Sequence, residues 1–168
     1  MFKKKCAFCE SHITHIDYGQ IEHFKPKSRY PELCFEWSNF LLSCPICNGA
    51  ANKGDKFPLA NEGGPLINPV AENPNYFFKF EYDTATKSFL LLPKTKRAAM
   101  TIKTMGLNRD DLAENRTILL AKIVFILENI IDRNLPREIL NEFSNLFSEK
   151  DEYYAFIKIL IKKVKLRL

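Results

Sequence analysis

The chain has 168 residues, of which 46% are hydrophobic, and its 25 lysines and arginines exceed its 20 aspartates and glutamates to give a net charge of +5. This length suffices for one domain with a core, or for a small domain with a packed appendage, and the hydrophobic content excludes a disordered chain. The basic surplus permits a polyanionic partner without requiring one. No run of about 18 uncharged apolar residues occurs, so we expect no membrane-spanning segment and no membrane partner.

The cysteines predict a structural metal site. The opening residues, MFKKKC, have no apolar segment behind the lysines and are unlike a signal peptide, so we expect a cytoplasmic protein with reduced thiols. Four of the five cysteines form two C-x2-C pairs, Cys6/Cys9 and Cys44/Cys47, and four thiolates saturate a tetrahedral zinc ion. The alternative is four unbound core cysteines that share this spacing by chance. For Cys34 we expect a small buried side chain.

The first part of the chain, up to about residue 75, is rich in Pro, Gly, Asn and charge. It has too few apolar residues to build a large core, and a zinc ion would compensate for this. Residues 18–24 predict a strand. Residues 36–42, with apolar side chains at helical spacing, predict a short helix, and residues 50–56 predict another. Residues 58–75, with four prolines, predict a loop.

The second part predicts a β-hairpin followed by helices. Residues 76–82 and 87–92 form the two strands of the hairpin. Four helices are expected, over residues 95–105, 109–132, 136–147 and 150–166. Gly106 would end the first, Pro136 suits the first turn of the third, and Ser148 would cap the fourth. The segment 117–131 is apolar nearly all round, as in a central buried helix.

The candidate catalytic residues lie between the cysteine pairs and just after them. Hydrolysis of a phosphodiester needs a base to activate water and a cation on the phosphate, and the dipeptide Glu22-His23 offers an imidazole and a carboxylate. On a strand these two side chains point to opposite faces, so a distortion near Lys25-Pro26 would be needed to unite them. Alone, the dipeptide is more typical of a structural histidine. The position of the dipeptide between the two C-x2-C pairs favours a functional histidine.

Four motifs together resemble a known family. E-H-x-x-P (22–26), W-x-N-x-L (37–41), C-x2-C-N (44–48) and K-G (53–54) are similar to the HNH, or His-Me finger, endonucleases, which have a ββα-metal core. The strings IEHFKPKSRYP, WSNFLLSC and NKGDKFPL resemble the zinc-stapled branch with the Septu-type (PtuB) and retron-associated HNH nucleases of anti-phage defence. The resemblance covers roughly residues 6–70.

The resemblance implies a role for each matching residue. His23 corresponds to the general base, and Glu22 to the acidic ligand of a catalytic Mg²⁺ or Mn²⁺ ion. Asn39 corresponds to the middle Asn that braces the loop carrying the histidine. Asn48 corresponds to the second protein ligand of the metal, and Lys53 to the basic residue near the substrate phosphate.

Two departures from the family pattern affect this assignment. The family usually has Asp where this chain has Glu22. The stretch from Asn48 to Lys53 is longer than the common C-N-x-x-K form, which leaves Asn52 as a competing metal ligand.

Further polar residues near the motifs have both a functional and a plain interpretation. Lys25, Lys27 and Arg29 can hold substrate phosphates, or can belong to a solvated loop. His12 and His15 can replace a zinc ligand or touch DNA, but exposed loop histidines are the plainer expectation. The basic residues of the last helix are expected to form an ordinary exposed face.

The sequence thus predicts an α+β protein with a zinc-stapled ββα-metal (HNH) core in residues 1–75 and a β-hairpin with a helical bundle, residues 76–168, packed on it. The expected function is a DNA endonuclease in anti-phage defence. The resemblance also implies a partner, an ABC-type or SMC-like ATPase. Two alternatives stay open: an inactive zinc-stapled nucleic-acid-binding or adaptor module, and an RNA-cleaving toxin.

Overall fold

The computed structural model describes residues 2–13 and 17–166, so His15 lies outside the described residues. The fold is α+β, as predicted. The strands are β1 (Gln20–His23), β2 (Phe40–Ser43), β3 (Phe78–Asp83) and β4 (Ser88–Pro93). The α-helices are α1 (Pro45–Asn48), α2 (Pro74–Phe77), α3 (Lys96–Met105), α4 (Asp110–Asp132), α5 (Arg137–Asn145) and α6 (Tyr154–Lys165). The strands form two antiparallel pairs, β1 with β2 and β3 with β4.

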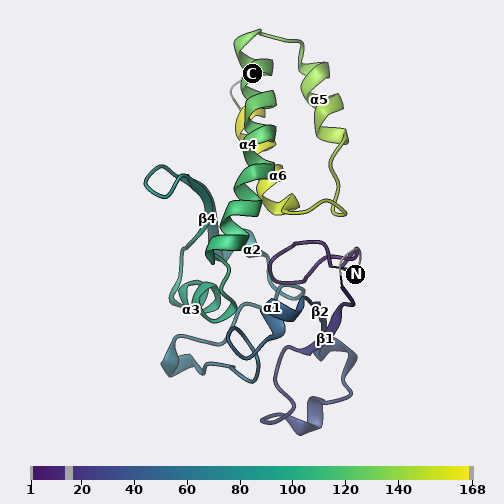
Figure 1. Ribbon diagram of the computed structural model, residues 1–168, viewed down its shortest axis with the longest axis vertical. Helices are drawn as coiled ribbons and strands as arrows, with labels where there is room; N and C mark the ends of the chain where they lie inside the picture. Colours follow the sequence, from purple (N-terminus) through teal and green to yellow (C-terminus); the bar gives the residue numbers. More distant parts are fainter. Residues whose placement is uncertain (1, 14–16, 167–168) are drawn as a thin grey trace.

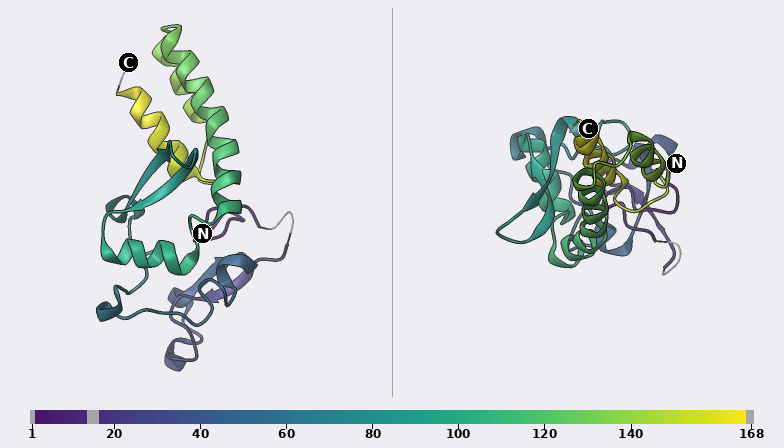
Figure 2. Two further views of the ribbon diagram at one scale, coloured as in Figure 1. Left: turned by 60° about the vertical axis from the view of Figure 1, so that its left-hand side comes forward. Right: turned by 90° about the horizontal axis from the view of Figure 1, so that it is seen from above.

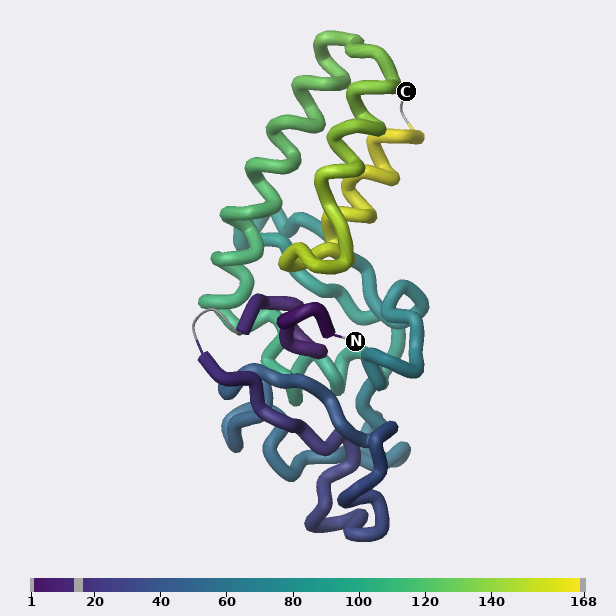
Figure 3. The backbone as a smooth tube through the Cα atoms, turned by 90° about the vertical axis from the view of Figure 1, so that its right-hand side faces the viewer, coloured from purple at the N-terminus to yellow at the C-terminus, as the bar shows by residue number. Residues whose placement is uncertain are grey.

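The molecule is elongated, with the two sheets at different levels. Figure 1 shows β1, β2 and α1 toward one end, and α4, α5 and α6 as a helical layer at the other. Figure 2 shows the β3–β4 hairpin and α3 between these two ends. In Figure 3 the N-terminal segment, residues 2–13, lies between α6 and the β1–β2 pair. A connected cluster of buried side chains runs through all of these parts, from Cys6 and Ile13 to Leu120 and Ile157.

The β1–β2 pair differs in part from the sequence prediction. The strand predicted within residues 18–24 is confirmed, but the helix predicted over residues 36–42 is wrong. A single 3-10 turn, Trp37–Asn39, leads directly into β2, where His23 lies opposite Phe40. The side chains of β2 alternate between the core and a more open face, as in a half-buried strand. Pairing with a distant strand has overridden a local helical spacing.

The helix predicted over residues 50–56 is also wrong. α1 ends at Asn48, and the N–H of Lys53 donates to the carbonyl oxygen of Cys47 at 3.2 Å. Gly54 has φ of +43°, a left-handed conformation that glycine adopts readily. The segment is a loop that folds back under α1 and carries the Lys53 side chain into the interior.

The predicted hairpin and the four predicted long helices are all present, with two corrections. α6 begins at Tyr154 rather than at residue 150, because Ser148 closes a turn in which its N–H donates to the Asp151 carboxylate at 2.7 Å. α4 is not buried all round, since Phe125 on its outer face is 68% exposed. No helix in residues 2–13 and 17–166 is long and apolar enough to cross a membrane.

Candidate active site and metal centre

The four cysteines of the two C-x2-C pairs converge on one point. Their Sγ atoms all lie within 4.8 Å of one another, and those of Cys9 and Cys44 are 4.0 Å apart. Sulfur atoms at the corners of a tetrahedron around zinc are separated by about 3.8 Å, given a Zn–S bond of about 2.3 Å. The cluster, which consists of Cys6, Cys9, Cys44 and Cys47, could therefore hold a structural zinc ion.

The pKa values of three of the four thiols, those of Cys6, Cys9 and Cys44, are lowered by their neighbours, whereas hydrogen bonding with the other cysteines raises the pKa of Cys47. The Cys44 Sγ atom caps α1 by accepting from the N–H of Cys47 at 3.4 Å, and hydrogen bonding with Cys47 lowers the pKa of Cys44 to about 7. Arg109, at the start of α4, directs Nη1 to the Cys47 Sγ atom at 3.9 Å. A zinc ion with four thiolates carries net negative charge, which this guanidinium offsets. The second half of the chain thus contributes to the cluster, and the sequence did not indicate this.

Glu22 and Lys53 form a buried ion pair beneath β1. The Lys53 Nζ atom contacts Oε1 of Glu22 and also donates to the carbonyl oxygens of His23 at 2.9 Å and Gly54 at 3.3 Å. Burial raises the pKa of the Glu22 carboxyl, and the Lys53 ammonium opposes that rise. Lys53 is 0% exposed, so its ammonium does not face a position open to a substrate phosphate. It instead ties the acid to the backbone of the neighbouring histidine.

His23 is the last residue of β1 and directly follows Glu22. Its Nε2 atom lies 2.9 Å from the carbonyl oxygen of Cys34, and its ring packs edge-to-face on Phe40. A carbonyl oxygen only accepts hydrogen bonds, so a neutral His23 carries its proton on Nε2 and keeps the lone pair on Nδ1. The loop after β1 therefore fixes the tautomer that leaves Nδ1 basic. Cys34 itself is half-buried rather than fully buried.

Asn39 holds the loop that connects β1 to β2. Its Oδ1 accepts from the N–H of Lys25 at 2.8 Å, while its Nδ2 donates to the carbonyl oxygens of Lys25 at 3.0 Å and Leu33 at 3.2 Å. These contacts join both ends of the loop that carries the carbonyl group of Cys34. Asn39 therefore makes the contacts that a bracing residue needs.

The side chains of Asn48 and Asn52 contact different elements of the fold. The Asn48 Nδ2 atom donates to Oε1 of Gln20 at 2.8 Å, and Gln20 shares a face of β1 with Glu22 because the two are separated by one residue. The Asn52 Nδ2 atom donates to the carbonyl oxygen of Ile46 at 2.8 Å, and its Oδ1 lies against Gly106. The geometry thus groups Asn48 with Glu22 and directs Asn52 toward the end of α3.

The basic residues of the β1–β2 loop have different surroundings. Lys25 is half-buried with its ammonium 5.4 Å from the centre of the Tyr30 ring, and Arg29 donates to the carbonyl oxygen of Phe57 at 2.9 Å. Lys27 is exposed. His12, far from this loop, binds the carbonyl oxygen of Lys150 at 2.6 Å and so links the two halves of the chain.

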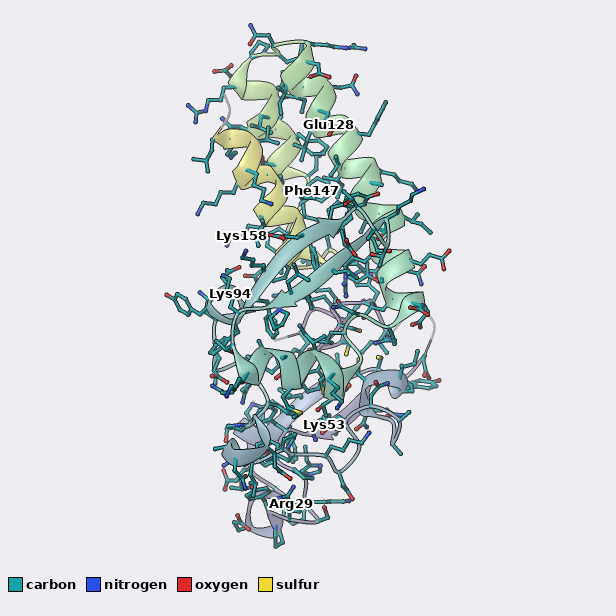
Figure 4. The ribbon with its side chains drawn as sticks, turned by 90° about the vertical axis from the view of Figure 1, so that its left-hand side faces the viewer. Arg29, Lys53, Lys94, Glu128, Phe147 and Lys158 are labelled. Carbon is teal, nitrogen blue, oxygen red and sulfur yellow. The ribbon has the colours of Figure 1, made fainter. Side chains whose placement is uncertain are left out.

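Three further residues near the site were not anticipated. Phe35 is 92% exposed and Trp37 is 78% exposed, on the loop that contacts His23. The sequence placed Trp37 in a short helix and in the W-x-N-x-L motif, with no role at the site. Asp55 is an exposed acid that lies close enough to Glu22 to raise the pKa of that carboxyl. Only its place in the N-K-G-D string could have singled it out. Figure 4 shows Lys53 within the lower part of the molecule, with Arg29 beyond it.

Removal of the Lys53 ammonium is expected to destabilise the fold strongly. Lys53→Met leaves the Glu22 carboxylate buried without its partner, which typically costs about 3–5 kcal/mol of the free energy of unfolding. The double variant Glu22→Gln/Lys53→Met removes both charges and should recover most of this loss. Urea unfolding of the three proteins measures the difference. Lys122→Met, at an exposed lysine of α4, is the matched control and should change little.

The loss should also depend on pH. Without Lys53, burial raises the pKa of Glu22 further, so the folded state holds a proton that the unfolded chain has released. The stability of Lys53→Met relative to the unsubstituted protein should therefore fall as pH rises from the ordinary range of a glutamate carboxyl. Urea unfolding at about pH 5 and pH 8 tests this sign. An equal loss at both pH values would show that the ion pair does not cause it.

Comparison with known proteins finds three relatives by sequence. "Septu protein PtuB" of Bacillus mycoides (strain KBAB4) is 30% identical over 93% of this chain and 65% of its own length. "Septu protein PtuB" of Bacillus thuringiensis is 30% identical over 79% of this chain and 48% of its own length. "Retron Vc95 putative HNH endonuclease" of Vibrio cholerae serotype O1 biovar El Tor is 28% identical over 82% of this chain and 67% of its own length. The chain thus spans between about half and two thirds of these relatives.

No family model matches the chain, and no solved structure matches it significantly. The similarity to the relatives extends well beyond the residues 6–70 on which the sequence motifs rest, since it covers 79% to 93% of the chain.

Proposed function

We propose that this chain, which belongs to the HNH nuclease family of the Septu and retron types, is a metal-dependent endonuclease that hydrolyses DNA phosphodiester bonds. Its place would be in anti-phage defence, as the nuclease partner of an ABC-type or SMC-like ATPase. In this proposal β1, β2 and α1 form the ββα-metal core. Residues 1–75 are the nuclease core, and residues 76–168 are the hairpin and helical region packed on it.

One observation carries the catalytic assignment, the hydrogen bond from His23 Nε2 to the carbonyl oxygen of Cys34 at 2.9 Å. It holds the imidazole in place and leaves Nδ1 as the atom that accepts a proton from water. Asn39 braces the loop on either side of that carbonyl group. A histidine held in this way needs no change of tautomer before it acts as a general base.

Glu22 and Asn48 would hold the Mg²⁺ or Mn²⁺ ion, because carboxylate and amide oxygens are donors that these ions accept. The Asn48 amide nitrogen is bound to Gln20, so its oxygen is the atom left for the metal. Lys53 occupies Oε1 of Glu22, so Oε2 would be the donor from that side chain. The bound ion would stabilise charge on the phosphate and on the leaving oxygen.

In the same proposal the zinc ion at the four cysteines is structural, and Lys25, Lys27 and Arg29 contact the DNA backbone. Lys27 and Arg29 are both exposed, and Arg29 also donates to the carbonyl oxygen of Phe57. Lys53 acts by positioning Glu22 and the backbone of His23 rather than by touching a phosphate, because its ammonium is fully buried.

A plasmid nicking assay with Mg²⁺ or Mn²⁺ tests both the activity and the metal ligand. The unsubstituted protein should nick the plasmid only when one of these ions is present, with the neighbouring ATPase added in a parallel series. Asn48→Ala should lose more than about 10-fold in rate at limiting metal, since even residues that only support ligands cost this much. Asn52→Ala should stay close to the unsubstituted rate. The reverse order would assign the ligand to Asn52.

The same assay separates the alternative functions. A zinc-stapled adaptor would bind DNA without nicking it under any metal condition. An RNA-cleaving toxin would degrade RNA while the plasmid stayed intact. Either result, obtained with a folded and zinc-loaded protein, would overturn the DNA endonuclease proposal.

A further inference from the structure

A groove of about 990 Å³ lies between the N-terminal segment, the strand β3 and the helix α6. It is distant in the fold from His23, since β1 lies on the other side of the N-terminal segment. Figure 4 shows Lys94 and Lys158 together on one side of the molecule, well above Lys53. Both lysines line the groove, and Lys53 does not.

The groove carries most of the basic surplus of the chain. Seven lysines and three glutamates line it, an excess of four positive charges, whereas the whole chain has a net charge of +5. The lysines are Lys3, Lys5, Lys79, Lys94, Lys158, Lys162 and Lys163. Outside the groove the chain has 18 basic and 17 acidic residues, so the net surplus of positive charge is concentrated in this groove.

The lysines of the groove differ in whether their ammonium groups already have a partner. Lys5 pairs with Glu10 at 3.5 Å and Lys79 pairs with Glu81 at 3.8 Å. Within the part of the chain that the structure describes, no ion pair or hydrogen bond engages the ammonium groups of four exposed lysines. These are Lys3, Lys158, Lys162 and Lys163. Lys158 and Lys162 are four residues apart on α6, a spacing at which like charges repel by about 0.2–0.5 kcal/mol. A bound polyanion would relieve this repulsion.

The wall beneath the lysines is apolar and partly aromatic. Phe78 and Phe80 of β3 are buried in it, while Phe2 and Tyr154 are half-buried and keep part of their rings accessible. Cations that follow a backbone, combined with aromatic rings that bases can contact, are the features by which proteins bind single-stranded nucleic acid. An acidic peptide would use the lysines but would have no particular use for the rings.

We propose that this groove binds a single-stranded nucleic acid, with the phosphates on the lysines of α6 and the N-terminal segment. It is a binding surface apart from the candidate catalytic site and goes beyond the proposed nuclease activity. Its position on the N-terminal segment, which carries Cys6 and Cys9, connects the groove to the metal cluster. A nucleic acid bound in the groove would stay on the protein whether or not the catalytic site cleaves it.

Binding of a fluorescent single-stranded oligonucleotide, followed by anisotropy, tests the proposal. The protein carries His23→Gln so that no cleavage interferes, and the groove variant adds Lys158→Glu and Lys162→Glu. We expect Kd to rise at least about 10-fold at about 0.1 M salt, and the slope of log K against log salt to fall by about 1.4, since each contact on a single strand contributes about 0.7. Thermal unfolding checks that both variants are folded.

The matched control is Lys103→Glu/Lys122→Glu, which makes the same change in net charge at two exposed lysines outside the groove. It should change Kd less than about 2-fold, the expectation for a contact limited to long-range attraction. Equal losses of affinity in both variants would show that binding depends only on net charge, and this would overturn the proposal. Equal affinity for a duplex of the same length would overturn the choice of a single strand.

Two more outcomes separate this proposal from others. If polyglutamate displaces the oligonucleotide at equal charge concentration, the groove recognises acidic polypeptides instead, and the proposal fails. If the groove variant loses binding while the nicking assay shows no cleavage by the protein with His23 intact, the groove stands and the endonuclease proposal fails.

Discussion

Cys47→Ser is expected to unfold the β1–β2 end of the molecule and to abolish zinc binding. Cys47 is fully buried, and its sulfur atom contacts Arg109 at the start of α4. A structural zinc ion contributes about 10–16 kcal/mol in small zinc-binding peptides, which equals or exceeds the whole stability of a typical domain, about 5–15 kcal/mol. The free energy lost with one of the four ligands therefore exceeds the free energy of unfolding that this part of the chain has without zinc.

Zinc content by elemental analysis and thermal unfolding by circular dichroism measure this effect. The unsubstituted protein should hold one zinc ion per chain, and Cys47→Ser should hold close to none and lose its cooperative transition. Cys34→Ser is the control, because Cys34 is the one cysteine outside the cluster. It should keep its zinc, and its free energy of unfolding should change by less than about 1 kcal/mol. A Cys47→Ser protein with full zinc content would contradict the assignment.

The cysteine cluster could be predicted from the sequence because its geometry is largely local. A C-x2-C turn brings its own two sulfur atoms together, so only the meeting of two such turns depends on the rest of the fold. The long helices after residue 95 were predictable for a similar reason, since a helix-ending residue such as Gly106 acts within one turn. The Arg109 contact to Cys47 was not predictable, because it joins residues from the two halves of the chain.

The parts of the site that sequence could not predict depend on long-range pairing. Lys53 suggested a surface residue beside a phosphate, yet it is buried against Glu22 across 30 residues of chain. The partner of His23 is a backbone carbonyl group, at Cys34, and no side-chain pattern marks a carbonyl group. The helix expected over residues 36–42 failed because β1 offers those residues a strand partner.

His23→Ala and His23→Gln are both expected to lower the rate of DNA cleavage by about 10²–10⁴-fold, the usual contribution of a general base. The two variants separate catalysis from structure. Alanine loses both the basic Nδ1 atom and the hydrogen bond to the carbonyl oxygen of Cys34. Glutamine has an amide N–H that can donate to this carbonyl group but has no basic nitrogen.

The expected pattern is loss of cleavage in both variants, with the free energy of unfolding lowered by about 0.5–1.5 kcal/mol in His23→Ala and nearly retained in His23→Gln. Single-turnover nicking with saturating Mn²⁺ and urea unfolding provide the two measurements, and zinc content confirms that the cysteine cluster is intact. If His23→Gln cleaves at a rate near that of the unsubstituted protein, His23 only holds the loop and the base lies elsewhere. Loss of cleavage in a stable His23→Gln protein would instead support a proton acceptor at this position, because the hydrogen bond to the carbonyl oxygen of Cys34 can be kept while the basic nitrogen is lost.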